Sequence, residues 1–178
     1  MKGEPLSWNI DKDEDQTTVT FTGVLDERCD LDPLHNLSGK VTFDLAGIAR
    51  INSVGVTQWV KFVEGLEDVT ELFFIHCSVP MVTQLNMIRS FGGNCSVDSF
   101  YAPYVCTVTG EEQDVLLTTR ELTDPLTPPT YPSDAGGELV LGDLPVRYFN
   151  FLKHIGKPWR RKNHSQGPTG ESAEENAE

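Results

Sequence analysis

The first hundred residues contain short apolar runs of strand length, separated by turn residues and by segments of helical spacing. The predicted strands are, in chain order, Leu6–Ile10, Thr17–Thr22, Val41–Leu45, Thr70–His76 and Cys95–Tyr101. The first two flank the charged turn 11–15 and predict an antiparallel hairpin, which Gly23 ends. Val41–Leu45 alternates only weakly, which indicates burial on both faces, as in a central strand of a parallel sheet.

Two segments between these strands predict amphipathic helices. The first follows Ser53, a natural N-cap, and the second follows Ser78 and has Pro80 in its first turn. Their apolar stripes are Val56, Trp59, Val60, Val63 and Leu66 in the first helix and Val82, Leu85, Ile88 and Phe91 in the second, which Gly92 and Gly93 end. A shorter helix is expected over Asp30–Leu37, with its leucines facing inward. The alternation of strand and helix predicts an α/β fold with a mostly parallel sheet.

The C-terminal part of the chain has a different pattern. Pro103–Val108 and Gln113–Thr119 predict a β-hairpin that extends the sheet or covers its edge. After a strand at Glu138–Leu141, Asp143 is expected to cap a short helix that docks on the domain. The inner face of that helix is expected to consist of Leu144, Tyr148 and Leu152, flanked by Phe149 and Phe151.

Length and composition indicate one main domain, because 178 residues can bury one good core. We expect a domain at 1–119, a Pro- and Gly-rich linker at 120–137, a strand and docking helix at 138–153, and a disordered tail at 154–178. The net charge of -13 argues against a nucleic-acid-binding surface. The N-terminus lacks the apolar run of a signal peptide, and no apolar stretch approaches the ~20 residues that span a bilayer. We therefore expect a cytoplasmic protein with reduced cysteines and no membrane insertion.

Three short motifs resemble the STAS family, which includes the anti-sigma-factor antagonists of bacterial partner switching. They are Val-Thr-Phe-Thr-Gly-Val-Leu-Asp at 19–26, Val-Thr-Phe-Asp-Leu at 41–45 and Asn-Ser-Val-Gly at 52–55. The resemblance implies a STAS-like α/β domain, with a mixed β-sheet and crossover helices on one face, to which this chain adds a C-terminal β-hairpin and short helix. It also implies a binding module with no catalytic residues and no cofactor, rather than an enzyme.

In partner-switching antagonists the first crossover helix begins with Asp-Ser-Ser-Gly, and a partner kinase phosphorylates the second serine. Asn52, Ser53, Val54 and Gly55 occupy these four positions, so valine stands where the phosphoacceptor is expected. Valine cannot carry a phosphoryl group, which adds about 1.5 to 2 negative charges. Either the switch has been lost or Ser53 has taken it over. A plain N-cap is the favoured interpretation of Ser53.

The loop 49–52 and the first turns of the following helix are the expected partner-binding surface. The candidate contact residues are Asp26, Arg50, Asn52, Ser53, Val54, Gly55, Thr57 and Phe62. Phe62 falls off the core stripe and is expected to be exposed. The expected partner is an anti-sigma factor, a related kinase-like regulator or another complex subunit. The alternative is ligand binding, or service as an accessory STAS subunit of a lipid-transport complex.

Catalytic interpretations of other residues are weaker, and an unrecognised enzyme ranks last. Asp26 and Asp44 lie in different segments with no clustered histidine, and a buried Asp44 needs a partner such as Arg50. His76 and Cys77 are adjacent, but a dipeptide is weak grounds for a nucleophile pair, and structural roles are favoured.

Metal and basic motifs are incomplete. Residues 104–110 have the outline of a zinc knuckle around Cys106, with Thr109 in place of the second cysteine. The pattern predicts a hairpin without metal, or one descended from a metal-binding form. The basic run 157–162 is expected to be part of a solvated tail.

Overall fold

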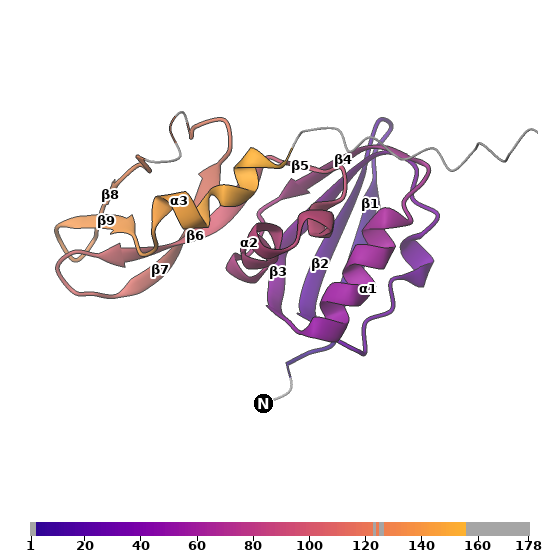
Figure 1. Ribbon diagram of the computed structural model, residues 1–178, viewed down its shortest axis with the longest axis horizontal. Coiled ribbons are helices and arrows are strands. Elements are labelled where there is room, and N and C mark those ends of the chain that lie inside the picture. Colours follow the sequence, from indigo (N-terminus) through magenta and orange to yellow (C-terminus); the bar gives the residue numbers. More distant parts are fainter. Residues whose placement is uncertain (1–2, 123, 125–126, 156–178) are drawn as a thin grey trace, which may run out of the picture.

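The computed structural model describes residues 3–122, 124 and 127–155. Its first part, which we call the first layer, is a β-sheet with helices packed on it (Figure 1). The strands of its sheet are β1 (Ser7–Lys12), β2 (Thr17–Leu25), β3 (Gly39–Ile51), β4 (Val69–Ile75) and β5 (Ser96–Val97). They lie in sequence order; β1 is antiparallel to β2, and the other neighbours are parallel. The expected α/β class and N-terminal hairpin are confirmed.

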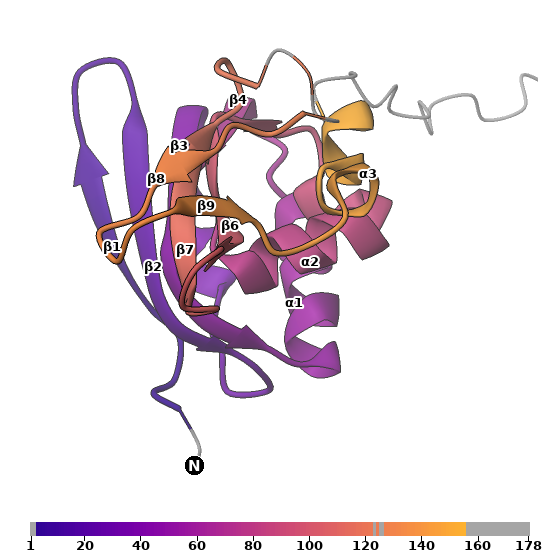
Figure 2. The same ribbon diagram turned by 90° about the vertical axis from the view of Figure 1, so that its left-hand side faces the viewer.

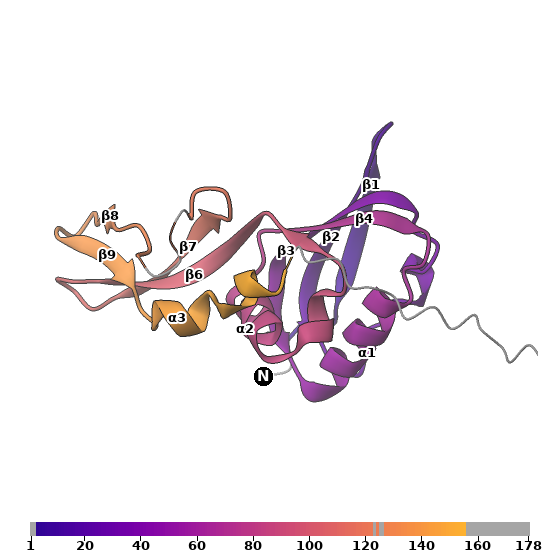
Figure 3. The same cartoon turned by 45° about the horizontal axis from the view of Figure 1, so that its top comes forward.

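Two helices, α1 (Ser53–Glu64) and α2 (Val79–Met87), cover one face of this sheet (Figures 1 and 3). The core between the helices and the sheet is rich in aromatic rings, which pack edge to face or stacked. Its fully buried members include Phe21, Phe43, Trp59, Phe62 and Phe74. Strand alternation on β2 to β4 and the helical stripe on α1 thus supply one continuous core.

Phe62 lies in this core, so the expectation that it is exposed was wrong. Its side chain is 1% exposed and its ring stacks on Phe43 with the centroids 5.8 Å apart. A helix that packs on a sheet buries a stripe at least about 100° wide. Phe62, next to Val63, falls within that width.

Several element boundaries also differ from expectation. The strand expected at Cys95–Tyr101 is divided between β5 of the first sheet and a second strand, Ser99–Cys106, and the second helix ends at Met87 instead of continuing to Phe91. Gly23 does not end β2, because the strand continues to Leu25 through a register shift between Gly23 and Val24. The helix expected at Asp30–Leu37 is a single 3-10 turn, Asp32–Leu34, although its leucines are buried as expected. A second 3-10 turn, Arg89–Gly92, follows α2. The longer β2 matters for the site because it carries the chain to Asp26.

A second, antiparallel sheet lies beside the first (Figures 1 and 2). It contains β6 (Ser99–Cys106), β7 (Glu112–Thr118), β8 (Tyr131–Pro132) and β9 (Glu138–Leu141), in the spatial order β7-β6-β9-β8. The hairpin β6–β7 is confirmed. It belongs to a separate sheet, and its contact with the first sheet is a parallel bridge between Phe100 of β6 and Cys77, just after β4. The hairpin pairs with β9, which no local pattern specifies. The division expected at residue 119 therefore cuts through this sheet.

The segment expected to be an irregular linker contributes to the second sheet. Tyr131 lies in β8 and packs edge to face against Tyr104, with ring centroids 5.7 Å apart. The Tyr104 hydroxyl donates a 2.9 Å hydrogen bond to the carbonyl of Pro129. These contacts fix the proline-rich chain on the sheet.

The C-terminal helical segment docks on α2, as expected. It consists of α3 (Pro145–Tyr148) and a 3-10 turn (Asn150–Lys153) rather than one helix, with Tyr148, Phe149 and Phe151 buried. The Asn86 side chain donates to the carbonyl of Tyr148 and accepts from the N–H of Phe151. The Tyr148 hydroxyl donates a 2.7 Å hydrogen bond to the carbonyl of Tyr101.

The expected inner face of this segment needs correction. Leu144 is 64% exposed, and Leu152 is only partly buried. Asp143 accepts a hydrogen bond from the N–H of Leu144 and pairs with Arg147, while Leu144 occupies the N-cap position. The helix breaks at Phe149, so the spacing of one continuous helix does not apply.

Removal of residues 143–178 is expected to lower the free energy of unfolding by at least about 3 kcal/mol. Three buried aromatic side chains would be lost, and each contributes about 1.5 to 3 kcal/mol before its ordering entropy is subtracted. Thermal melting of the two truncated chains, ending at residues 142 and 155, measures the effect. The chain ending at 155 keeps all of these contacts and should melt close to the full-length protein. Equal melting temperatures for both truncations would show that the docked segment adds no stability.

Within the described part of the chain, no helix is long and apolar enough to cross a membrane. The expected disordered tail and the basic run 157–162 lie outside the described residues, apart from His154 and Ile155 at the start of the tail.

Candidate functional site

The expected partner surface is formed where β2 and β3 end and α1 begins. Asn52 is the N-cap of α1, and its Oδ1 accepts a 2.8 Å hydrogen bond from the N–H of Gly55. The backbone N–H of Asn52 donates to the carbonyl of Leu25 at 3.1 Å, and its amide Nδ2 donates to Glu27 at 2.9 Å. The expectation that Ser53 is the cap was therefore wrong, because the chain enters the helix one residue earlier. Ser53 is the first helical residue, and its side chain is exposed.

Gly55 allows α1 to start in contact with the end of β2. A Cβ built on Gly55 would lie 2.0 Å from the carbonyl oxygen of Leu25 and 2.9 Å from the backbone nitrogen of Asp26. No side chain fits between the two backbones at these distances. Gly55 therefore fixes the position of the first turn of α1 against the sheet, and it is buried rather than available to a partner.

The exposed side of this turn is apolar at one position. Val54 is 45% exposed, with Ser53 and Thr57 exposed beside it. Gln58 and Lys61 follow Val54 at i+4 and i+7, so these three side chains form one row along α1. We call this row the α1 ridge.

Asp26 and Arg50 do not join the α1 ridge. Asp26 is 7% exposed, and its carboxylate binds the guanidinium of Arg28 with a shortest distance of 2.6 Å. Arg28 also donates to the carbonyl of Gly3, so this pair holds the N-terminal segment in place. Arg50 lies on β3 opposite Val24 and is exposed. Asp26 is thus structural, and Arg50 lies at the edge of the candidate surface.

The turn between β2 and β3 forms a groove of about 240 Å³ beside the α1 ridge. Its lining residues are Cys29, Asp30, Leu31, Asp32, His35, Gln58, Lys61 and Phe62. Burial raises the pKa of Cys29, whose thiol donates to Oε1 of Gln58. Sequence reasoning missed this groove, although the inward leucines at 31 and 34 indicated that the turn packs close to the domain.

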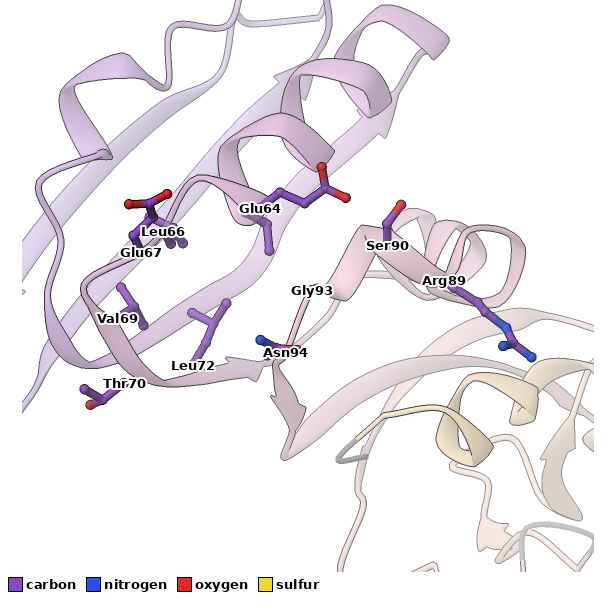
Figure 4. Close-up of a pocket in the computed structure, with 11 residues that line it drawn as sticks. Glu64, Leu66, Glu67, Val69, Thr70, Leu72, Arg89, Ser90, Gly93 and Asn94 are labelled. Carbon is purple, nitrogen blue, oxygen red and sulfur yellow. The ribbon is translucent and has the colours of Figure 1, made fainter. Parts of the chain in front are cut away.

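A larger cavity of about 470 Å³ lies at the opposite end of α1, between that helix, β4 and the turn after α2 (Figure 4). Val63, Leu66, Val69 and Leu72 supply its apolar lining. Figure 4 shows Glu64 extending from the end of α1 toward Ser90, while Arg89 points away from the cavity. No sequence motif indicated this cavity, because its residues come from three separate elements.

His76 and Cys77 each have surroundings that indicate a structural role. The His76 Nδ1 lies 3.1 Å from Asp44, which answers the expected need of that carboxylate for a partner; Arg50 does not fill this role. His76 has a φ of 50°, which turns the chain after β4. Cys77 is completely buried, and burial raises the pKa of its thiol well above the ordinary value. A thiol in that environment is a weak nucleophile.

Comparison with known proteins adds no relative: no family model, no curated protein and no solved structure matches this chain.

Proposed function

We propose that this protein is a non-enzymatic interaction module that binds another protein through the start of α1. The observation that carries the proposal is Val54, an apolar side chain 45% exposed on a turn whose backbone is fixed from both sides. The Asn52 cap and the Gly55 contact hold this turn in one conformation. A rigid apolar residue with polar neighbours suits a small interface core, because little entropy is lost on binding.

The partner we propose is an anti-sigma factor or a related kinase-like regulator in the cytoplasm, as the STAS resemblance implies. The arrangement of an antiparallel β1, parallel β2 to β5 and helices on one face supports that resemblance. Val54 at the acceptor position favours an interaction that phosphorylation does not switch. Ser53 is exposed and is not the cap, so a phosphoryl group on Ser53 would leave the Asn52 hydrogen bond in place.

Affinity purification of the full-length protein from its native host, followed by mass spectrometry, tests this function. A kinase-like regulator that co-purifies at a constant ratio supports the proposal. Release of this regulator when an excess of the purified protein is added would show that the contact is direct. Recovery of the protein alone under gentle cross-linking would contradict the proposal.

The second candidate is ligand binding, or service as an accessory subunit of a lipid-transport complex. The 470 Å³ cavity with its apolar lining favours this alternative, because small-molecule sites are concave and mostly apolar. The same purification discriminates the two, since transporter subunits would co-purify in place of a regulator.

A further inference from the structure

The two hairpins of the second sheet are closed by turns that share one spacing. In the first, Cys106 is followed four residues later by Gly110, with φ 72°; in the second, Ser133 is followed four residues later by Gly137, with φ 75°. The N–H of Gly110 donates to the carbonyl of Cys106, and the N–H of Gly136 donates to that of Ser133, each at 2.9 Å. One turn follows β6 and the other follows β8.

The two turns meet at the sulfur of Cys106. The Ser133 hydroxyl donates to this sulfur at 3.2 Å, and the sulfur lies 3.6 Å from the carbonyl oxygen of Gly136. The side chain and backbone of Thr109 also hydrogen-bond to this sulfur. Two positions from each turn therefore lie around one point: 106 and 109 from the first turn, and 133 and 136 from the second.

The spacing of these four positions along the chain is that of the ligands of a structural zinc site. Structural zinc takes pairs of ligands spaced as Cys-x-x-Cys, and a tetrahedral ion with Zn–S bonds of ~2.3 Å keeps its sulfurs ~3.8 Å apart. The side-chain oxygen of Ser133 lies 3.2 Å from the Cys106 sulfur, so a ligand at position 133 would be within reach of the same ion. Glycine with positive φ after each pair lets the turn fold back so that both ligands of a pair point to one side.

We propose that the second sheet is a two-knuckle zinc-binding frame that has lost its metal, with ligand positions 106, 109, 133 and 136, of which only position 106 keeps a cysteine. Hydrogen bonds of Ser133 and Thr109 to the sulfur now take the place of the bonds to zinc. Packing takes over the stabilising role: Phe100, Tyr104 and Leu139 are buried, and α3 packs nearby. A small sheet without a metal needs such support.

Restoring the thiols tests this proposal in the full-length chain. The double variant Thr109→Cys/Ser133→Cys would present three thiolates, and zinc accepts three protein ligands with water as the fourth. We expect it to bind about one Zn²⁺ per chain by elemental analysis after gel filtration. Co²⁺ in its place should give the visible absorption of a tetrahedral thiolate complex. A triple variant adds Gly136→Cys, at a position whose φ of 84° strains a side chain but whose Cβ meets no atom.

The matched control, Thr107→Cys/Asp134→Cys, moves one new thiol by two residues and the other by one, and it has the same number of cysteines. The proposal predicts no retained metal in this control or in wild type, and loss of zinc when Cys106→Ser is added to the double variant. Stoichiometric zinc in the double or triple variant, with none in the shifted control or in wild type, supports the proposal that this frame is a zinc site that has lost its metal. No zinc in either variant, equal zinc in the shifted control, or loss of the far-ultraviolet circular dichroism of both restored variants would overturn it.

Discussion

A Val54→Glu variant is expected to lose at least roughly 100-fold in affinity for the protein partner while its domain stays folded. In the free protein the carboxylate would face solvent in the first turn of α1, where the helix dipole favours a negative charge. In the complex the same carboxylate would be buried without a partner, which costs several kcal/mol. Binding titration by calorimetry or interferometry measures the change, and circular dichroism reports the fold.

Val146→Glu is the matched control for this experiment. Val146 is 56% exposed and also lies in the first turn of a helix, but that helix is α3, in the C-terminal segment that docks on α2. The variant has the same change in charge, so any general effect of added acidity appears in both proteins. Wild-type affinity in Val54→Glu would place the interface elsewhere, and equal losses in both variants would point to long-range electrostatics.

A Gly55→Ala variant is expected to be destabilised by about 2 to 3 kcal/mol, the upper part of the usual range of about 1 to 3 kcal/mol for an overpacked core position. The new Cβ would lie 2.0 Å from the carbonyl oxygen of Leu25, so α1 and the end of β2 must separate. That movement also strains the hydrogen bond from Asn52 to Leu25. For a chain of this size the melting temperature should fall by about 2 to 4 °C for each kcal/mol.

Ser53→Ala, two residues earlier in the same turn, is the comparison for Gly55→Ala. Ser53 is exposed and its side chain does not cap the helix, so we expect a change within about 0.5 kcal/mol. Both variants are measured by thermal or urea denaturation of the full chain. Equal melting temperatures for the Gly55→Ala and Ser53→Ala proteins would show that α1 and β2 are not in backbone contact.

Local periodicity predicted the elements of the first layer well. The hairpin β1–β2, the strand β4 and the helix α1 follow from residue patterns within single segments, and such patterns act over a few residues. Ser53 and Asn52 are both good caps, and the choice between them depends on Leu25, which is distant in sequence. Phe62 differs from its predicted surface position because the buried face of α1 is wider than the narrow helical stripe on which the prediction rests.

The second sheet was predictable only in part. The hairpin β6–β7 has local signals, whereas the pairing of Tyr104 with Leu141 joins residues far apart in the chain. No periodicity encodes such a pairing. The equal spacing of Cys106 to Gly110 and of Ser133 to Gly137 is visible in the sequence, but only the structure shows that the two turns meet.

The position of Asn86 sets an order of assembly as the chain leaves the ribosome. The residues of α2 emerge early, together with the sheet that α2 covers, but the two backbone groups that the Asn86 amide binds belong to Tyr148 and Phe151. Until those residues are synthesised, the Asn86 amide must stay hydrated, and Phe100 lacks the ring of Phe151 that packs on it at 5.0 Å. The nascent chain therefore exposes Phe100, at the start of β6, until the last described segment brings the rings of Phe149 and Phe151 against it.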